Sequence, residues 1–280
     1  MGILQMASGK KWESGLEAEL RKLQKQELRK MKQAKKERSN GLLLRVEEKI
    51  PQKVLSGLKK AFRKVFFLVF SKGAGVIEKT FDKDALQKDY AVRNYAVDLK
   101  GGKKEIRQFG KDIKIQTMKN MAVSAAEGVG LGALGIGLPD IALFVGMLLK
   151  GVYETSLKYG FCYETQEEQT FILKLLEASV SKGDDWTRLN FEIDSFIEEE
   201  IHTVPSEEEW NRQVERTADA FAAELLVMKF IQGLPVVGII GGMGNPVYYR
   251  KIMDYIQLKY KKRYLTVKIR EKAQTVSKQN

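Results

Sequence analysis

The sequence contains a single cysteine, Cys162, and a single histidine, His202. One cysteine excludes an intrachain disulfide and is typical of a reducing compartment. Because there is only one histidine beside it, the chain lacks the ligands of a common zinc site and a convincing Ser-His-Asp triad. Neither a GxSxG nor a GxxxxGK[ST] motif occurs. We therefore predict no metal, no cofactor and no catalytic residue, and enzyme activity is disfavoured.

Charge is distributed unevenly along the chain, whose formal net charge is +12. Residues 1–72 hold 19 Lys/Arg and 7 Asp/Glu, whereas residues 73–280 hold 29 of each. Within that second part, residues 164–224 are acidic and residues 250–278 are basic. Basic ends around an acidic middle indicate an anionic partner for the ends, either lipid or nucleic acid.

Helical periodicity dominates, and no convincing strand pattern is present. Two pairs, Thr165 with Glu168 and Ser206 with Glu209, have the spacing of capping boxes at helix starts. The predicted fold is all-α: a basic helical extension at residues 1–45, then an all-helical domain at residues 46–280. The extension carries few large apolar residues, so we expect it to add little to the core. The expected helices lie at about residues 10–38, 50–72, 82–99, 166–181 and 186–201, with further ones starting near residues 103 and 206.

The segment 50–72 is predicted to be an amphipathic helix with one apolar face and many lysines on the rest. Such a helix binds anionic lipid, and the basic run "KYKKRYLTVKIR" near the end of the sequence fits the same partner. The alternative, that the helix packs on its own core and its lysines are solvated, stays open. The expected lipid-contacting residues are Lys53, Lys59, Lys60, Phe62, Arg63, Lys64, Phe66, Lys261, Lys262 and Arg263.

Residues 127–151 carry seven glycines and a central Pro-Asp pair. The literal GxGxxG inside this stretch follows a helical pattern instead of a strand, so it does not predict dinucleotide binding. A charge at the centre disfavours a simple membrane span. We predict a tight helical hairpin, either buried in the protein or shallowly inserted in lipid, and a related one at residues 232–246. The expected packing residues are Gly137, Pro139, Asp140, Gly146, Gly233, Pro235, Gly238 and Gly242.

Four stretches carry a resemblance to a known family: "GLPDIALFVGMLLKGVYETSLKYGF", "TQEEQTFILKLL", "LPVVGIIGGMGN" and "YIQLKYKKRYL". In their order and spacing they resemble the EcsC family over about residues 75–268, with residues 1–45 as an addition. The family is named for a bacterial gene beside those of an ABC transporter. The resemblance implies a bacterial, membrane-proximal setting and a candidate ABC-transporter partner, and it supplies no catalytic residues.

Together these patterns favour a non-enzymatic protein of the cytoplasm that is peripheral to the inner face of the cell membrane. It would act by interaction with anionic lipid, with a membrane transporter, or with both. Two alternatives stay open: a hydrolase that acts on lipid or peptide through carboxylates, and nucleic-acid binding through the basic helices. Nucleic acid is the disfavoured partner, because the aromatic residues lie on the apolar face instead of among the lysines.

Overall fold

In the computed structural model, the described residues are 15–32, 51–100, 104–111, 139–199, 203–231 and 246–279. Every regular element among them is a helix, which confirms the all-α prediction. The elements are the helix of residues 15–32, α3 (Gln52–Leu68), the π-helical turn η1 (Val69–Gly73), α4 (Ala74–Glu78), α5 (Lys83–Lys100), the helix of residues 104–111, α7 (Pro139–Lys158), α8 (Gln166–Val180), α9 (Gly183–Glu198), α10 (Glu207–Ile231) and α12 (Pro246–Gln279).

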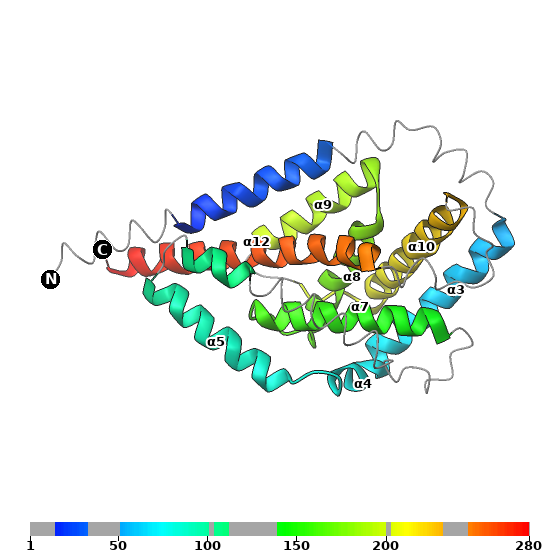
Figure 1. Cartoon of the computed structure of the whole chain (residues 1–280), viewed down its shortest axis with the longest axis horizontal. Helices are drawn as coiled ribbons and strands as arrows, with labels where there is room; N and C mark the ends of the chain where they lie inside the picture. Colours follow the sequence, from blue (N-terminus) through cyan, green and yellow to red (C-terminus); the bar gives the residue numbers. More distant parts are fainter. Residues whose placement is uncertain are drawn as a thin grey trace.

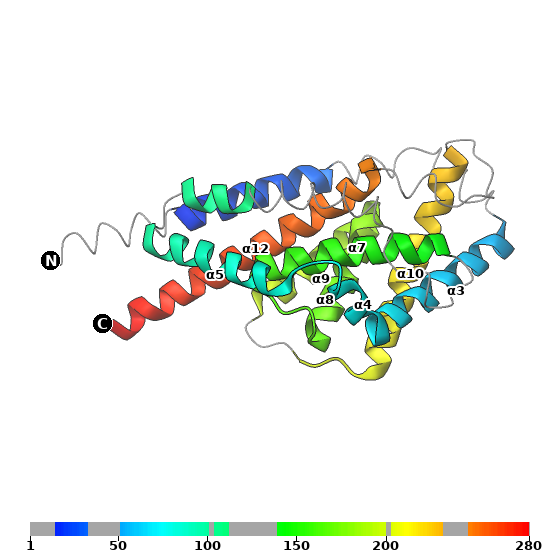
Figure 2. The same ribbon diagram turned by 60° about the horizontal axis from the view of Figure 1, so that its bottom comes forward.

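The long helix α12 runs through the middle of the molecule and contacts α7, α8 and α9 (Figures 1 and 2). On the other side, α10 contacts α3 and α8, and α3 also contacts α7. The ring centroids of Phe62 and Phe66 on α3 lie 5.9 and 5.7 Å from that of Phe221 on α10. The ring of Phe144 on α7 lies 6.2 Å from the same phenylalanine. This aromatic cluster joins three helices into one core.

Both predicted capping boxes lie at helix starts, but only one is reciprocal. At α10, the backbone N–H of Ser206 donates to the Glu209 carboxylate at 2.8 Å, and the Glu209 N–H donates to the Ser206 hydroxyl at 3.2 Å. At α8, the Thr165 hydroxyl accepts from the Glu168 N–H at 3.3 Å. The Glu168 carboxylate turns away instead, and it binds two side chains of α12.

The helix of residues 15–32 packs against α12 instead of standing apart from the core. Its Leu16 is fully buried and Leu23 is 5% exposed. Its carboxylates Glu19 and Glu27 are buried as well, and both pair with lysines of α12. The expectation that this segment adds little to the core is therefore wrong for the described residues. The division of the chain between residues 45 and 46 stays a prediction.

The glycine-rich stretches are described only in part. Gly137, Gly233, Pro235, Gly238 and Gly242 lie outside the described residues, so the predicted packing of the two hairpins remains a prediction. α7 begins at Pro139, followed by Asp140, where a proline suits the first helical turn. Gly146 is buried within this helix. Among the helices of the described residues, none is both long and apolar enough to cross a lipid bilayer.

Close approach between α7 and α12 depends on a different glycine, Gly151. A Cβ atom at this position would lie 2.2 Å from the hydroxyl oxygen of Tyr249 on α12, and the next nearest atoms, of Met253, lie at 3.3 Å. Gly151→Ala is therefore expected to lower the free energy of unfolding by about 1–3 kcal/mol through overpacking. Urea denaturation followed by circular dichroism measures this change.

Two further variants make that experiment specific to the contact. Gly57→Ala on α3 adds a Cβ atom with nothing within 4 Å, so it should stabilise the protein by about 0.5–1 kcal/mol. Tyr249→Phe removes the oxygen that the new methyl group meets, so it should recover part of the loss in a Gly151→Ala background. If Gly151→Ala unfolds at the same urea concentration as the wild type, the two helices do not approach this closely in solution.

Candidate functional site

The basic residues of α3 divide into two groups on different sides of the helix. Lys59 and Arg63 face α10, where the Lys59 amine lies 2.9 Å and the Arg63 guanidinium 3.0 Å from the Asp219 carboxylate. Arg63 also lies 3.2 Å from the carboxylate of Glu215. These two cations form ion pairs that join α3 to the acidic part of the chain. Their charge is therefore largely neutralised within the protein.

The remaining lysines of α3, Lys53, Lys60 and Lys64, are exposed. Their spacings of seven and four residues put them on one face of the helix, and the half-exposed ring of Phe67 continues that face. None of the three lysines forms an ion pair with a residue that the structure describes. We call Lys53, Lys60, Lys64 and Phe67 the outer face of α3.

The two aromatic residues expected to touch lipid, Phe62 and Phe66, lie in the core. Phe62 and Phe66 are fully buried and contact Phe221, as the fold requires. Their place in the lipid-contacting set is therefore corrected: they are the apolar side by which α3 packs on its own protein. Phe67, which the sequence pattern did not single out, is the exposed ring of this helix.

The basic run near the end of the sequence requires a similar correction. Lys261, Lys262 and Arg263 lie on α12 with side chains that are 14%, 8% and 11% exposed. Each is bound to a carboxylate of another helix, and these are Glu19, Glu27 and Glu168, respectively. Their charges stabilise contacts within the molecule, and they do not form a surface patch.

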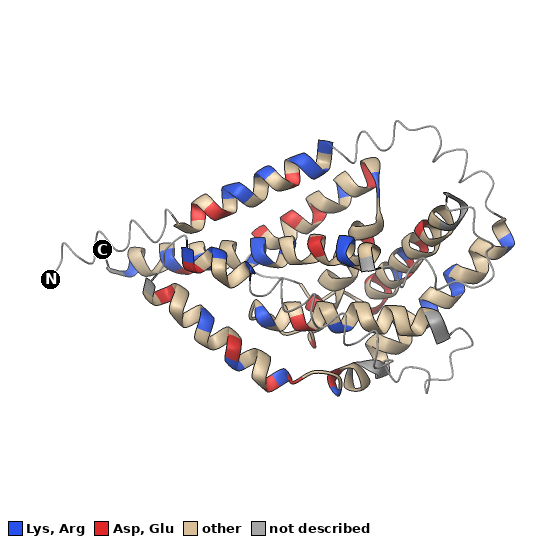
Figure 3. Cartoon of the chain, in the orientation of Figure 1, with Lys and Arg blue, Asp and Glu red and all other residues tan. Residues whose placement is uncertain are grey.

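A buried network of four charged side chains joins the helix of residues 15–32 to α9 and α12. The Lys259 amine, fully buried, lies 2.5 Å from carboxylate oxygens of both Glu27 and Asp194. The Lys262 amine lies 2.9 and 2.8 Å from the same two carboxylates. Burial alone would lower the pKa of Lys262, but the charges and hydrogen bonds of Glu27 and Asp194 outweigh it and raise that pKa. Figure 3 shows acidic and basic bands on these neighbouring helices.

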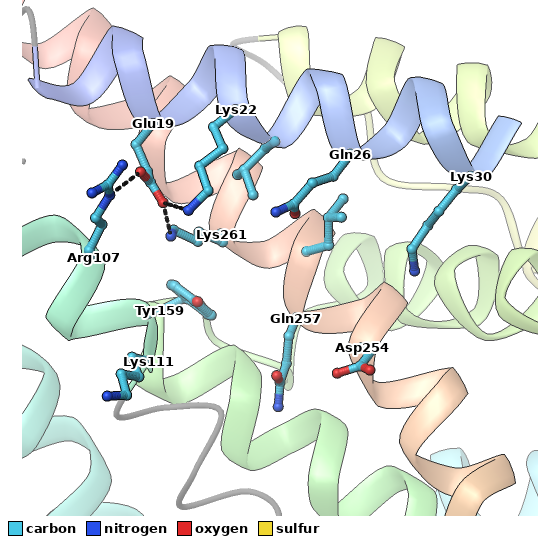
Figure 4. Close-up of a pocket in the computed structure, with 13 residues that line it drawn as sticks. Glu19, Lys22, Gln26, Lys30, Arg107, Lys111, Tyr159, Asp254, Gln257 and Lys261 are labelled. Carbon is cyan, nitrogen blue, oxygen red and sulfur yellow. Dashed lines mark hydrogen bonds and ion pairs between the residues drawn. The ribbon is translucent and has the colours of Figure 1, made fainter. Parts of the chain in front are cut away.

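An open pocket of about 490 Å³ lies beside this network, between the helices of residues 15–32 and 104–111, α12 and the end of α7 (Figure 4). The charged side chains of its lining are mainly basic. Five cations line it against two carboxylates, and these are Lys22, Lys30, Arg107, Lys111 and Lys261 against Glu19 and Asp254.

Glu19 stands at one end of the pocket, bound to cations from two other helices (Figure 4). Its carboxylate accepts from the Lys261 amine at 2.8 Å and from Nε of Arg107 at 3.2 Å, and the Lys22 amine lies at 3.6 Å. Burial by itself raises the pKa of Glu19, but the bonds and charges of these cations outweigh it, and the pKa lies below its usual value. Burial lowers the pKa of Lys261, and the charges of Lys22 and Arg107 act in the same direction, although Glu19 opposes them.

The single cysteine and the single histidine, considered above as candidate functional residues, are not among the described residues that line this pocket. Cys162 is exposed, and its thiol lies 3.2 Å from the Glu164 carboxylate. His202 lies outside the described residues. Within the ranges that the structure describes, no three or more His, Cys, Asp or Glu side chains are grouped so as to hold a metal ion.

Sequence reasoning named only Lys261 among the residues of the pocket, because the others come from distant segments. One signal was present. Glu19 and Glu27 share the helical stripe of Leu16 and Leu23, at spacings of three, four and four residues. Carboxylates on the apolar stripe of a helix indicate buried ionic partners, which here are supplied by α12.

A model of the EcsC protein family matches residues 16–265. The match includes the helix of residues 15–32 almost entirely, so it extends further than the motifs at residues 75–268. The curated Protein EcsC of Bacillus subtilis (strain 168) is 27% identical over 204 residues, which cover 72% of this chain and 75% of that protein. No solved structure matches the chain.

Proposed function

This chain belongs to the EcsC protein family, and we propose that it associates peripherally with an anionic membrane surface through the outer face of α3. The observation that carries the proposal is the arrangement of Lys53, Lys60 and Lys64, which are exposed, share one helix face and have no carboxylate partner among the described residues. Each lysine near an anionic surface contributes roughly 1 kcal/mol. The ring of Phe67 is 50% exposed and adds an apolar group to the same face of the helix as the three lysines.

The position of α3 in the molecule supports this surface. In Figures 1 and 2, the first turns of α3, α7 and α12 and the last turn of α10 lie toward the same end. Of these helices, α10 and α7 contact α3. In the sequence, the apolar glycine-rich stretches precede α7 and lie between α10 and α12. Peripheral membrane binding combines basic residues with apolar ones, and this chain contains both.

The test is sedimentation of the full chain with lipid vesicles. Replacing Lys53, Lys60 and Lys64 together with glutamine should weaken binding to phosphatidylglycerol-containing vesicles by about 100-fold, because three contributions of roughly 1 kcal/mol are lost. Phosphatidylcholine vesicles should bind neither protein. Lys59 and Arg63 are left unchanged, because their replacement would break the contact with Asp219 on α10.

A matched control removes the same charge elsewhere. Lys25, Lys88 and Lys278 are exposed lysines on the helix of residues 15–32, α5 and α12, and their replacement by glutamine should change vesicle binding little. Equal losses in the two triple variants would show that only net charge matters and would contradict the assignment of the outer face. DNA added as a competitor tests the nucleic-acid alternative. Release of the protein from the vesicles by DNA would favour that alternative if the protein binds DNA as tightly as it binds the vesicles.

An ABC transporter remains the partner expected from the family's name. No contact among the described residues bears on it, so it stays a prediction alongside the cytoplasmic, inner-face location. Co-purification of the outer-face variant with a membrane fraction would indicate that a protein partner, and not lipid, holds this protein at the membrane.

A further inference from the structure

We propose that the pocket between the helix of residues 15–32, the helix of residues 104–111 and α12 binds a phosphate monoester carried on a small hydroxylated body. This site is separate from the outer face of α3, and its ligand is either a soluble phosphorylated compound or the exposed headgroup of a lipid.

The charge of the pocket favours an anion. Five cations line it against two carboxylates, which leaves an excess of three positive charges in one open cavity. At the end near Glu19, three cations share that single carboxylate. A phosphate monoester carries close to two negative charges at neutral pH. The group that best offsets this excess is therefore a doubly charged oxyanion and not a single carboxylate.

The cations keep hydrogen-bond donors for such a group. A guanidinium has five N–H donors, and Arg107 uses only its Nε on Glu19; its two terminal nitrogens have no partner among the described residues. Lys111 is exposed and forms no ion pair with a described residue. The Lys22 amine, 3.6 Å from Glu19, is too far for a good hydrogen bond. Arginine and lysine together are the residues that proteins use for phosphate.

The lack of a side chain at Gly110 leaves room for the side chain of Lys261. A Cβ atom at this position would lie 3.0 Å from the amine nitrogen of Lys261 and 3.1 and 3.2 Å from two of its carbons. The glycine therefore lets the buried stem of Lys261 lie directly against the helix of residues 104–111. The lowered pKa of Lys261, caused by burial and then by the neighbouring cations despite Glu19, fits an amine that a further anion would stabilise.

The rest of the pocket indicates what the phosphate is attached to. Gln26 and Gln257 face the cavity from opposite helices, beyond the cluster around Glu19 (Figure 4). Their amides both donate and accept hydrogen bonds, as hydroxyl groups require. The volume of about 490 Å³ exceeds what a bare phosphate fills. A short polyol attached to the phosphate matches this half of the cavity.

Calorimetric titration of the full chain with sn-glycerol 3-phosphate, and with glycerol as the uncharged probe, tests the proposal. We expect binding of the phosphate ester only. Replacing both Arg107 and Lys111 with glutamine should weaken it by about 100-fold, since each hydrogen bond to a charged group accounts for about tenfold. The control pair Lys25→Gln and Lys88→Gln removes the same charge outside the pocket and should leave the affinity unchanged. Lys111→Gln alone, which breaks no described ion pair, should still cause about a tenfold loss.

Vesicles that contain phosphatidylinositol 4-phosphate, a lipid whose headgroup carries a phosphate monoester on a ring with free hydroxyl groups, distinguish the two sources. Binding of these vesicles that depends on Arg107 and Lys111, without binding of glycerol 3-phosphate, assigns the site to a lipid headgroup. Binding of the soluble ester assigns it to a free metabolite. The variant with glutamine at Lys53, Lys60 and Lys64 should keep its affinity for glycerol 3-phosphate. Vesicle binding through α3 and ester binding in the pocket can therefore fail independently of each other. The proposal is overturned if neither probe binds, or if the control pair weakens binding as much as the pocket pair does.

Discussion

Replacing Glu27 with alanine is expected to lower the free energy of unfolding by about 3–5 kcal/mol, the usual cost of breaking a buried ion pair from one side. The Glu27 side chain is 8% exposed and binds both Lys259 and Lys262. Its loss leaves two buried amines with Asp194 as their shared carboxylate. Chemical denaturation at neutral pH measures the change.

The control for this prediction is another glutamate of the same helix. Glu17 is 54% exposed and, among the described residues, pairs only with Arg21, one turn along. Glu17→Ala should therefore change stability by no more than about 0.5 kcal/mol. A Glu27→Ala variant as stable as Glu17→Ala would mean that the helix of residues 15–32 is not docked on α12 in solution. In that case the pocket beside it would lack one of its walls.

Replacing Glu168 with alanine is expected to cost a similar amount, about 3–5 kcal/mol, because it leaves the buried charge of Arg263 without a carboxylate partner in the described part of the chain. Glu168 accepts from the Tyr260 hydroxyl at 2.6 Å and lies 2.5 Å from the Arg263 guanidinium. Burial, followed by the charge of Glu168, raises the pKa of Tyr260, so its hydroxyl stays a donor even in mildly alkaline solution. The guanidinium also lies over three aromatic rings, of Phe161, Phe171 and Phe196, at 4.1, 4.7 and 5.2 Å from their centroids.

Two variants separate charge from packing at this position. Glu168→Gln keeps an acceptor for Tyr260 but removes the charge that faces Arg263, so its loss should be smaller than that of alanine. Glu167→Ala changes the neighbouring glutamate, which is only partly buried, and should fall within about 0.5 kcal/mol of the wild type. If Glu168→Ala retains wild-type stability, Arg263 has solvent access, and its original interpretation as a lipid contact becomes tenable again.

Local features of the fold could be predicted because they depend on neighbours in the sequence. The capping pair Ser206 and Glu209 is three residues apart, and the structure forms it as expected. The capping role of Glu168 was predicted only in part, since its carboxylate is drawn to Tyr260 and Arg263, more than 90 residues away. A stronger, charged partner from another helix outweighed the local hydrogen bond.

The candidate site was less accessible to sequence reasoning for the same reason. A lysine on an amphipathic helix looks identical whether its amine faces solvent or a carboxylate of another helix. On α3 this difference separates Lys60, which is exposed, from Lys59, which lies 2.9 Å from Asp219. Apart from the place of Glu19 on an apolar stripe, the pocket has no sequence signature, because Lys22, Arg107 and Lys261 lie far apart in the chain and meet only in the folded protein.

The sequence by itself determined the all-α class, several of the helix starts and the segregation of charge, because periodicity, capping and composition are local properties. Only the tertiary structure decided how that charge is used. It pairs the basic run of α12 with Glu19, Glu27 and Glu168 inside the protein, and it leaves the outer face of α3 exposed. The physical reason is that an ion pair requires charges within a few ångströms, and in this protein helices distant in sequence supply the two partners.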